Sequence, residues 1–194
     1  MNGGGPDSGG LLVVLSGPSG VGKKTVIDRV LAETPGYSRA VTATTRAPRP
    51  TEVDGVDYFF LTEEVFSARL SREEFLEHAV VHGRRYGTLR QPVIEILDRG
   101  EVCFLEVDVQ GAATIRGLIT PALFVFLVPP SLEALEERLR GRATEDEASL
   151  TNRLATARRE LEREGEYDVS VVNDELDRAV REVRDQVERW RGRP

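Results

Sequence analysis

The stretch SGPSGVGKKT at residues 16–25 decides how the rest of the sequence is interpreted. Residues 17–23 have the spacing G-x-x-x-x-G-K, an apolar run LLVVL precedes them at 11–15, and a helical pattern follows over 22–33. A strand, a glycine-rich turn and a helix in this order are typical of a phosphate-binding loop. Glycines let backbone N–H groups turn inward around an anion, and the start of the helix adds its positive end. The stretch therefore predicts binding of a nucleoside triphosphate, with Lys23 on its terminal phosphates.

One position of this motif departs from its usual form. A Ser or Thr hydroxyl that contacts Mg²⁺ is expected directly after the lysine, and Lys24 stands there instead. Thr25 is the nearest hydroxyl, but one step along a helix turns the side chain by about 100°. Three arrangements are open: Lys24 points to solvent while water takes the ligand place, Lys24 contacts phosphate, or metal binding is lost. Lys23 and Lys24 are the only lysines of the chain.

Short apolar runs alternate with helical patterns along the rest of the chain. Strands are expected at 57–61, 101–109, 122–130 and 168–172, and helices at 62–70, 71–78, 91–100, 131–142, 146–164 and 173–190. The helix at 71–78 is predicted from a capping box formed by Ser71 and Glu74. The alternation of strands and helices predicts a mainly parallel α/β sheet. The segment 41–90 is rich in strand and loop patterns and is interpreted as an insertion into that core.

Composition excludes several classes of function. The chain has 194 residues and a net charge of 26 − 33 = −7, which argues against a general nucleic-acid or anionic-membrane binder. The single cysteine, Cys103, lies in an apolar run and is predicted to be a buried core thiol. The two histidines, His78 and His82, fit no metal-ligand pattern. Residues 1–10 have neither a basic start nor an apolar stretch, so we expect a disordered tail and, by default, a cytoplasmic protein.

Further motifs follow the loop in a characteristic order. They are TTRAPR (44–49), DYFF (57–60), EFLEH (74–78), RRYGT (84–88), EVDVQG (106–111), LVPPS (127–131), GRATE (141–145) and VND (172–174). With these motifs the chain resembles guanylate kinase over about residues 11–188. The resemblance implies an α/β fold with a three-layer, parallel-sheet P-loop kinase core (11–40, 91–137 and 164–194), a mixed-β GMP-binding insert (41–90) and a helical lid (138–163).

The resemblance also implies the residues of the ATP site. They are Gly17, Pro18, Ser19, Gly20, Val21, Gly22, Lys23, Lys24, Thr25, Arg138, Arg142 and Asn173. The catalytic residues implied are Lys23, Arg46, Arg142 and Arg153. Phosphoryl transfer spreads negative charge over the equatorial oxygens, which positioned guanidinium groups stabilise. Ala143 stands where the family usually has the glycine of GRGTE. An alternative role for Asn173 is structural, because Asn173 or Asp174 would also cap the last helix.

The GMP site implied by the resemblance comprises Thr42, Arg46, Arg49, Tyr58, Glu77, Tyr86, Thr88 and Asp108. Glu77 is the expected reader of the base. A carboxylate only accepts hydrogen bonds, and guanine offers N1–H and a 2-amino group on one edge. Adenine has an acceptor at N1 and no 2-amino group, so it leaves the carboxylate unpaired. A polar site of this kind discriminates by roughly 10⁴-fold or more.

Glu106 and Asp108 are the candidate residues for Mg²⁺, which is the expected cofactor together with ATP. At i and i+2 of a strand they point to the same face, at the carboxyl edge where nucleotide sites form in parallel sheets. The two carboxylates would contact the metal directly or through water. The alternative role for the pair is structural, as partners in a salt bridge.

The implied function is transfer of the γ-phosphate of MgATP to GMP or dGMP, giving ADP and GDP or dGDP, within purine nucleotide metabolism. ATP and GMP or dGMP are then the partners, with no nucleic acid, membrane or obligate protein partner. The alternative is a guanylate-kinase-like binding module of weak activity that recognises GMP or a phosphorylated partner, and Lys24 is the feature that favours it. Kinases of other nucleoside monophosphates conflict with TTRAPR and Glu77.

Overall fold

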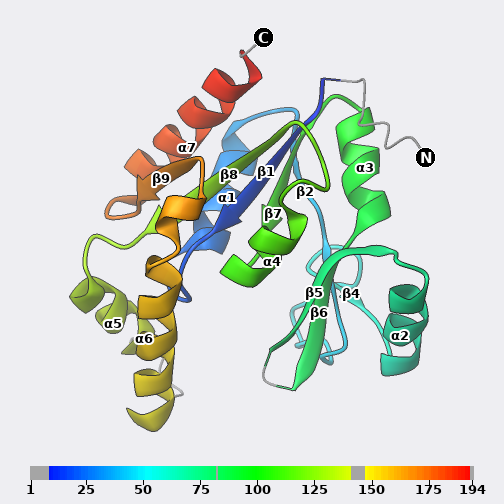
Figure 1. The fold of residues 1–194 in the computed structure, drawn as a ribbon, viewed down its shortest axis with the longest axis horizontal. Coiled ribbons are helices and arrows are strands. Elements are labelled where there is room, and N and C mark those ends of the chain that lie inside the picture. The colour runs from blue at the N-terminus through cyan, green and yellow to red at the C-terminus, as the bar shows by residue number, and fades with distance from the viewer. Residues whose placement is uncertain (1–8, 82, 141–146, 193–194) are drawn as a thin grey trace.

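A five-stranded parallel sheet forms the centre of the molecule in a computed structural model, which describes residues 9–81, 83–140 and 147–192. The strand order is β2 (Tyr37–Arg39), β7 (Val102–Glu106), β1 (Leu11–Ser16), β8 (Ala122–Val128) and β9 (Val169–Val172) (Figure 1). All neighbouring strands in this sheet pair in parallel. The predicted parallel α/β core is confirmed.

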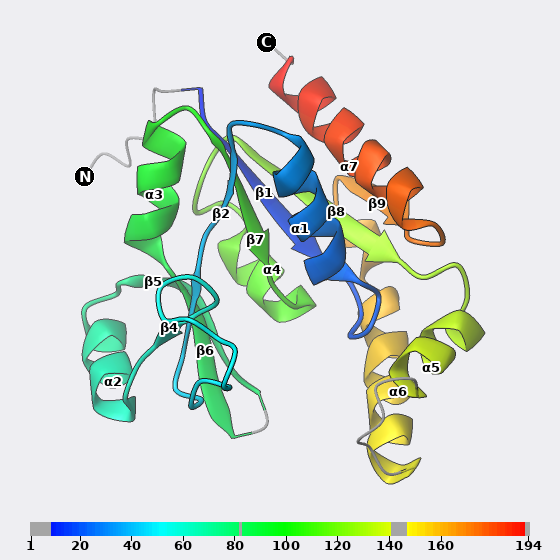
Figure 2. The ribbon, with the colours of Figure 1, turned by 180° about the vertical axis from the view of Figure 1, so that it is seen from behind.

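Helices cover both faces of this sheet and make three layers. On one face lie α1 (Lys23–Glu33) and α7 (Leu176–Arg191), and on the other lie α3 (Arg90–Asp98) and α4 (Val109–Ile115) (Figures 1 and 2). The side chains of β1 alternate between two hydrophobic cores, so that Val13 packs on the α1 side and Val14 on the α3 side. A strand buried on both faces needs an unbroken apolar run, which is what LLVVL supplies. The helix α4 was not expected from the sequence.

A second, four-stranded sheet lies entirely within 41–90. Its order is β4 (Phe59–Phe60), β3 (Thr42–Thr44), β6 (Arg84–Leu89) and β5 (Phe75–Val81). The pair β3–β4 is parallel and the other two pairs are antiparallel, so the predicted mixed sheet is confirmed. With α2 (Glu63–Ser71) it has its own small core, in which the rings of Phe66 and Phe75 stack 4.4 Å apart.

The predicted helix at 71–78 is wrong. Ser71 is the last residue of α2, and its hydroxyl donates to Ala68 O instead of capping a new helix. The backbone N–H groups of Glu73 and Glu74 donate back to Leu70 O (3.0 Å) and Arg69 O (3.1 Å), which is a Schellman end with Glu73 at φ 56°. The chain then enters β5 directly, because pairing with the neighbouring strand β6 and burial of Phe75 and Leu76 in two different cores outweigh the local helical signal.

The helices α5 (Leu132–Arg140) and α6 (Glu147–Leu161) stand beside the carboxyl edge of the central sheet (Figure 1). They pack on each other through Leu135, Leu139, Leu150 and Ala157. Arg142 and Ala143 lie outside the described residues. A short 3₁₀ helix at Glu164–Glu166 leads from α6 to β9.

Cys103 on β7 is fully buried, as predicted, and burial raises the pKa of its thiol to about 12. A thiol with so high a pKa is not a nucleophile at neutral pH. Among the described helices, none is at once long and apolar enough to cross a membrane.

Candidate active site

The phosphate loop joins β1 to α1 at the carboxyl end of the central sheet. Gly17 has φ 138°, and a Cβ there would lie 2.4 Å from the carbonyl oxygen of Leu127 on β8. Gly22 has φ 102° and is the N-cap of α1. Both positions accept only glycine without strain. The G-x-x-x-x-G spacing is therefore set by the turn that brings the loop around the start of α1.

Lys23 is folded back onto the loop that carries it. Its Nζ donates to Gly17 O at 2.6 Å and to Pro18 O at 3.2 Å. Backbone carbonyls are acceptors that a phosphate oxygen can replace, so the ammonium lies within the loop and close to where a phosphate would enter. This position agrees with the expected role of Lys23.

Lys24 points to solvent, as in the first of the three arrangements left open by the sequence, whose other half, water in the ligand place, stays a prediction. Its side chain is 63% exposed, and its Nζ lies 3.0 Å from Asp28 Oδ2, one turn along α1. The other carboxylate oxygen of Asp28 accepts from Arg39 at the end of β2. Burial raises the pKa of Asp28, but the hydrogen bonds and charges of Lys24 and Arg39 outweigh it and lower the pKa below its ordinary value.

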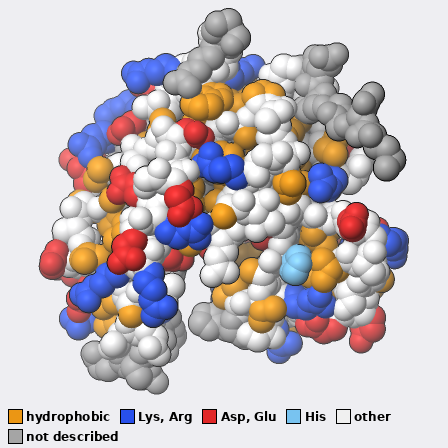
Figure 3. Space-filling view, in the orientation of Figure 1, with side chains coloured by type: hydrophobic (Ala, Val, Ile, Leu, Met, Phe, Trp, Pro, Cys, Tyr) orange, Lys and Arg blue, Asp and Glu red, His pale blue; other side chains and the backbone are white. Residues whose placement is uncertain are grey.

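A cavity of about 540 Å³ opens between the loop and the second sheet. Figure 3 shows the surface hollowed between the part that carries α6 and the part that carries β5 and β6. The cavity is lined by most of the residues predicted for GMP, namely Thr42, Arg49, Tyr58, Glu77, Tyr86 and Asp108, and by Lys23 and Lys24 of the loop. The structure thus brings the predicted acceptor residues and the phosphate loop to one hollow.

The polar end of this cavity is a row of residues across three strands. Thr42 on β3 pairs with Thr88 on β6, and Thr88 pairs with Glu77 on β5. The hydroxyl of Thr88 donates to Glu77 Oε1 at 2.7 Å, and Glu77 is 8% exposed. Burial raises the pKa of Glu77, the Thr88 hydrogen bond lowers it and the charge of Asp108 raises it, with a net rise. A buried carboxylate with one hydroxyl donor has acceptor capacity left for a ligand.

Arg46, in contrast, lines neither this cavity nor the others described in the region. Its Nη2 lies 2.8 Å from Glu52 Oε1, and its guanidinium lies 5.4 Å from the ring centre of Tyr58. Glu52 raises the pKa of Arg46, so the pair is fully ionised. Arg46 therefore stands behind Tyr58 in this structure and reaches a phosphate only by leaving Glu52.

A larger cavity of about 1070 Å³ runs from the loop to α6. Arg153 lines it, and its Nη2 donates to Ser19 Oγ at 3.0 Å, which brings this predicted catalytic arginine against the phosphate loop. Glu160, which lies about two turns further along α6, also lines this cavity. Burial raises the pKa of Glu160 against the lowering effects of Lys23 and the Ser19 N–H.

A third cavity, of about 420 Å³, lies on the outer side of the loop and is lined by Gly20, Val21, Gly22, Thr25, Arg138 and Asn173. Asn173 Nδ2 donates to Val21 O at 2.7 Å, and Arg138 Nη2 donates to Asn173 O at 2.8 Å. The capping alternative for Asn173 is wrong, because α7 begins after Glu175 and has no side-chain cap. The two side chains instead tie the loop to the segment after β9.

The expected Mg²⁺ ligands fit a hydrated ion. Glu106 ends β7, while Asp108 lies beyond the strand as the N-cap of α4, where it accepts from Gly111 N at 2.7 Å. Both line the cavity of about 540 Å³ and the cavity of about 1070 Å³. No group of three or more metal-ligating side chains occurs among the described residues. Two carboxylates suit a Mg²⁺ ion that takes its other ligands from phosphate and water.

Sequence reasoning missed four charged residues around the site. Asp28 pairs with Lys24 and Arg39, Glu52 pairs with Arg46, and Glu160 lines the cavity of about 1070 Å³. A local signal existed for two of them. Asp28 follows Lys24 at i+4, and Glu160 follows Arg153 at i+7 on one face of a helix. Arg39 and Glu52 meet their partners only through the fold.

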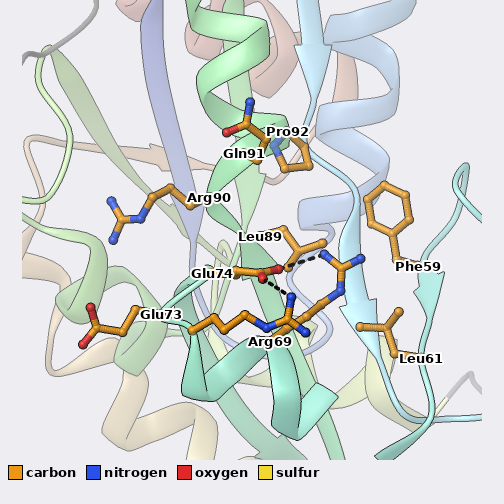
Figure 4. A pocket seen from close by; sticks show the side chains of 10 residues that line it. Phe59, Leu61, Arg69, Glu73, Glu74, Leu89, Arg90, Gln91 and Pro92 are labelled. Atoms are coloured by element: carbon orange, nitrogen blue, oxygen red, sulfur yellow. Dashed lines mark hydrogen bonds and ion pairs between the residues drawn. The ribbon is translucent and has the colours of Figure 1, made fainter. Parts of the chain in front are cut away.

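A separate cavity of about 610 Å³ lies where the second sheet joins α3. Figure 4 shows Glu74 bridged by arginine side chains, with Arg69 Nη1 at 3.1 Å and Arg72 Nη1 at 3.2 Å from its oxygens. Phe59 and Pro92 are among its apolar walls. None of the residues predicted for a nucleotide lines it, so we assign it no part in the reaction.

Comparison with known proteins agrees with this geometry. The guanylate kinase family model matches residues 10–190. A guanylate kinase of a Synechococcus species is 47% identical over 88% of this chain and 93% of its own length, and one of Bifidobacterium longum is 49% identical over 90% and 91%. The crystal structure of guanylate kinase from Anaplasma phagocytophilum matches with a TM-score of 0.76 and 30% identity, over 96% of this chain and 89% of its own. The chain belongs to the guanylate kinase family.

Proposed function

We propose that the protein transfers the γ-phosphate of ATP to GMP or dGMP and releases ADP with GDP or dGDP. The observation that carries this proposal is the cavity that holds Glu77 at one end and Lys23 of the phosphate loop at the other. Family membership and the relatives named guanylate kinase support the same activity.

Recognition of the acceptor rests on the base end. The free acceptor capacity of Glu77 suits N1–H and the 2-amino group of guanine, and the Thr88 hydroxyl fixes the carboxylate in place. Arg49, Tyr58 and Tyr86 line the middle of the cavity and would bind the GMP phosphate. The Arg46 guanidinium joins them once it leaves Glu52.

The transfer itself needs positioning and charge stabilisation. The acceptor phosphate is already ionised, so no general base is required. Lys23 holds the terminal phosphates of ATP, and Arg153, which already contacts Ser19 of the loop, stabilises the charge of the transferred group. Closure of α6 over the cavity would exclude water and suppress hydrolysis. Mg²⁺, held through Asp108 and Glu106 with water, would supply further neutralisation of the phosphate charge.

The same proposal covers the division into a core, a GMP-binding insert at 41–90 and a lid at 138–163. It also covers a cytoplasmic place in purine nucleotide metabolism, which is supported by the nature of the substrates and by a lone, buried cysteine.

The first test is ADP release by the purified protein with MgATP, with and without GMP. dGMP, AMP, CMP and UMP serve as parallel acceptors. We expect turnover with GMP and dGMP and background rates with the other three. Turnover with AMP equal to that with GMP would contradict the role of Glu77.

The binding-module alternative gives a different outcome, namely tight binding of GMP without turnover. No observation on the described residues favours it, since the loop keeps Gly17, Gly22 and Lys23 and the base end keeps Glu77. Rescue of turnover by Lys24→Ser would then identify position 24 as the cause.

A further inference from the structure

Lys24 lies where the donor and acceptor cavities meet. The cavities of about 540 Å³ and about 1070 Å³ share eight lining residues, which are Ser19, Lys23, Lys24, Arg49, Tyr58, Val81, Glu106 and Asp108. In a direct transfer, the phosphoryl group passes through the region common to both nucleotides. Position 24 is therefore beside the transferred group.

The charges of this shared region give Lys24 a specific effect. Lys23 and Arg49 stand against Glu106 and Asp108, so the region without Lys24 has two positive and two negative side chains. The usual hydroxyl at position 24 is neutral, whereas Lys24 adds a net positive charge. That charge attracts a phosphate oxygen and repels a cation at the same place.

The resting partner of Lys24 can be given up easily. Lys24 and Asp28 are 63% and 48% exposed, and exposed i, i+4 pairs are weak. Asp28 keeps a second cation, Arg39, when Lys24 leaves it. The lysine side chain is flexible and carries three donors, so it can turn about its stem toward the cavity that it already lines.

We propose that Lys24 leaves Asp28 when ATP binds and contacts an oxygen of the terminal phosphate, where it takes over part of the neutralisation that Mg²⁺ would otherwise supply. The inference rests on the proposed function of the same site. Its consequence is that this protein binds ATP in the absence of metal better than a protein with Ser at position 24, and gains less affinity when Mg²⁺ is added.

The test is calorimetric binding of ATP in excess EDTA and again in excess Mg²⁺, with the natural protein and Lys24→Ser. In EDTA, we expect Lys24→Ser to weaken ATP binding about tenfold, the usual effect of a lost hydrogen bond to a charged group. In Mg²⁺, the restored hydroxyl should narrow the difference to a few-fold. Equal affinities in EDTA would overturn the proposal and leave Lys24 as a surface ion pair.

Three further measurements locate the contact. ADP, which lacks the terminal phosphate, should bind both proteins equally in EDTA, and an equal loss for ADP would overturn the assignment to that phosphate. GMP should also bind both equally, and a loss for GMP alone would move Lys24 to the acceptor. Asp28→Asn removes the carboxylate that competes for Lys24, so it should strengthen ATP binding in EDTA. Weaker binding would contradict the proposal that Lys24 exchanges Asp28 for phosphate.

Arg29→Ser is the matched control. Arg29 lies on the same helix, carries the same charge and pairs with Glu33 and Asp177, but it lines none of the three cavities around the loop. Arg29→Ser should leave the affinity for ATP in EDTA unchanged. If it weakened ATP binding as much as Lys24→Ser does, the effect of Lys24→Ser would come from the change in net charge and not from a contact with phosphate. GMP-dependent turnover of the natural protein is measured separately, so failure of the kinase proposal is distinguishable from failure of this one.

Discussion

The two ends of the acceptor cavity are built differently. At the base end, Glu77 is buried, accepts one hydrogen bond from Thr88 and has acceptor capacity left for guanine. At the phosphate end, Lys23 donates to loop carbonyls and Lys24 to Asp28, while Arg46, which does not line the cavity, donates to Glu52. The base end is ready for its ligand, whereas the phosphate end holds its cations on oxygens of the protein.

The difference follows from the cost of leaving groups unpaired. A carboxylate has four lone-pair directions, and one good donor already fixes its position. Clustered cations repel each other, so each is held by an acceptor of the protein itself. Guanine therefore adds hydrogen bonds to an existing arrangement, while phosphate must exchange partners. We infer that the base end determines which acceptor binds and the phosphate end determines how fast transfer occurs.

The largest expected effect is that of Lys23→Ala. Loss of one preorganised donor from a charge-stabilising site commonly lowers kcat by about 10²- to 10³-fold. Steady-state kinetics with MgATP and GMP would measure this. The affinity for GMP, measured by calorimetry without ATP, should stay unchanged, because the base end is independent of the loop. A comparable loss of GMP affinity would break the distinction between the two ends.

Glu77→Gln should have the reverse selectivity of Lys23→Ala: it should weaken the use of GMP and leave the binding of ATP unchanged. The amide presents a donor to the donors of guanine, so kcat/KM for GMP should fall roughly 10- to 100-fold, as expected for lost hydrogen bonds to a charged group. The KM for ATP should stay the same. Thr88→Ala is the milder companion variant, since it removes only the hydroxyl that orients the carboxylate. An equal rise in the KM for both nucleotides would show that Glu77 supports the whole cleft.

The same variant should make the free protein more stable. Burial raises the pKa of Glu77 in the folded state, so its contribution to stability is present below the ordinary pKa and is lost as the pH rises through the raised pKa. At neutral pH the raised pKa of Glu77 is therefore a cost to the folded state, and a neutral amide removes that cost. The thermal midpoint at neutral pH should rise in Glu77→Gln, whereas a lower midpoint would mean that Glu77 is needed for packing.

The raised pKa of Glu77 also predicts how GMP binding depends on pH. Guanine needs the ionised carboxylate, so the affinity for GMP should fall as the pH drops through the pKa of Glu77, by up to about tenfold per unit below it. The GMP phosphate has a titration of its own, with a second pKa of about 6. Glu77→Gln shares the phosphate titration and lacks the carboxylate, so the difference between the two pH profiles isolates Glu77. Identical profiles would rule Glu77 out as the titrating group.

Much of the fold could be predicted because local signals agreed with it. The apolar runs became β1, β7 and β8, and the glycines of the loop mark conformations that other residues do not adopt. The failure at 71–78 arose because Ser71 and Glu74 have the spacing of a capping box, although the residues after them form the first strand of the β5–β6 hairpin. This strand buries Phe75 and Leu76 in two different cores, and a local helical pattern does not report that packing.

The candidate site could be predicted as a set of residues but not as an arrangement. The motifs supplied Glu77, Thr88 and Thr42, and the strand register placed them in one row. The partners Asp28 and Glu52 were missed, since the motifs name the cations Lys24 and Arg46 and not the acceptors that hold them. Arg142 lies outside the described residues, so its role stays a prediction.

The smallest effect is expected at Glu73, which stands at the C′ position of α2 just before β5. Glu73 is the one described non-glycine residue with positive φ, and glycine adopts φ 56° without a Cβ penalty. Glu73→Gly should therefore raise the free energy of unfolding by about 0.5 kcal/mol, after the added freedom of the unfolded chain is subtracted. Urea denaturation would measure it, with Glu64→Gly in the first turn of the same helix as a control of opposite sign. The kcat/KM for GMP should not change, because the row of Glu77, Thr88 and Thr42 is held by strand pairing. A changed kcat/KM would show instead that the base end depends on how α2 ends.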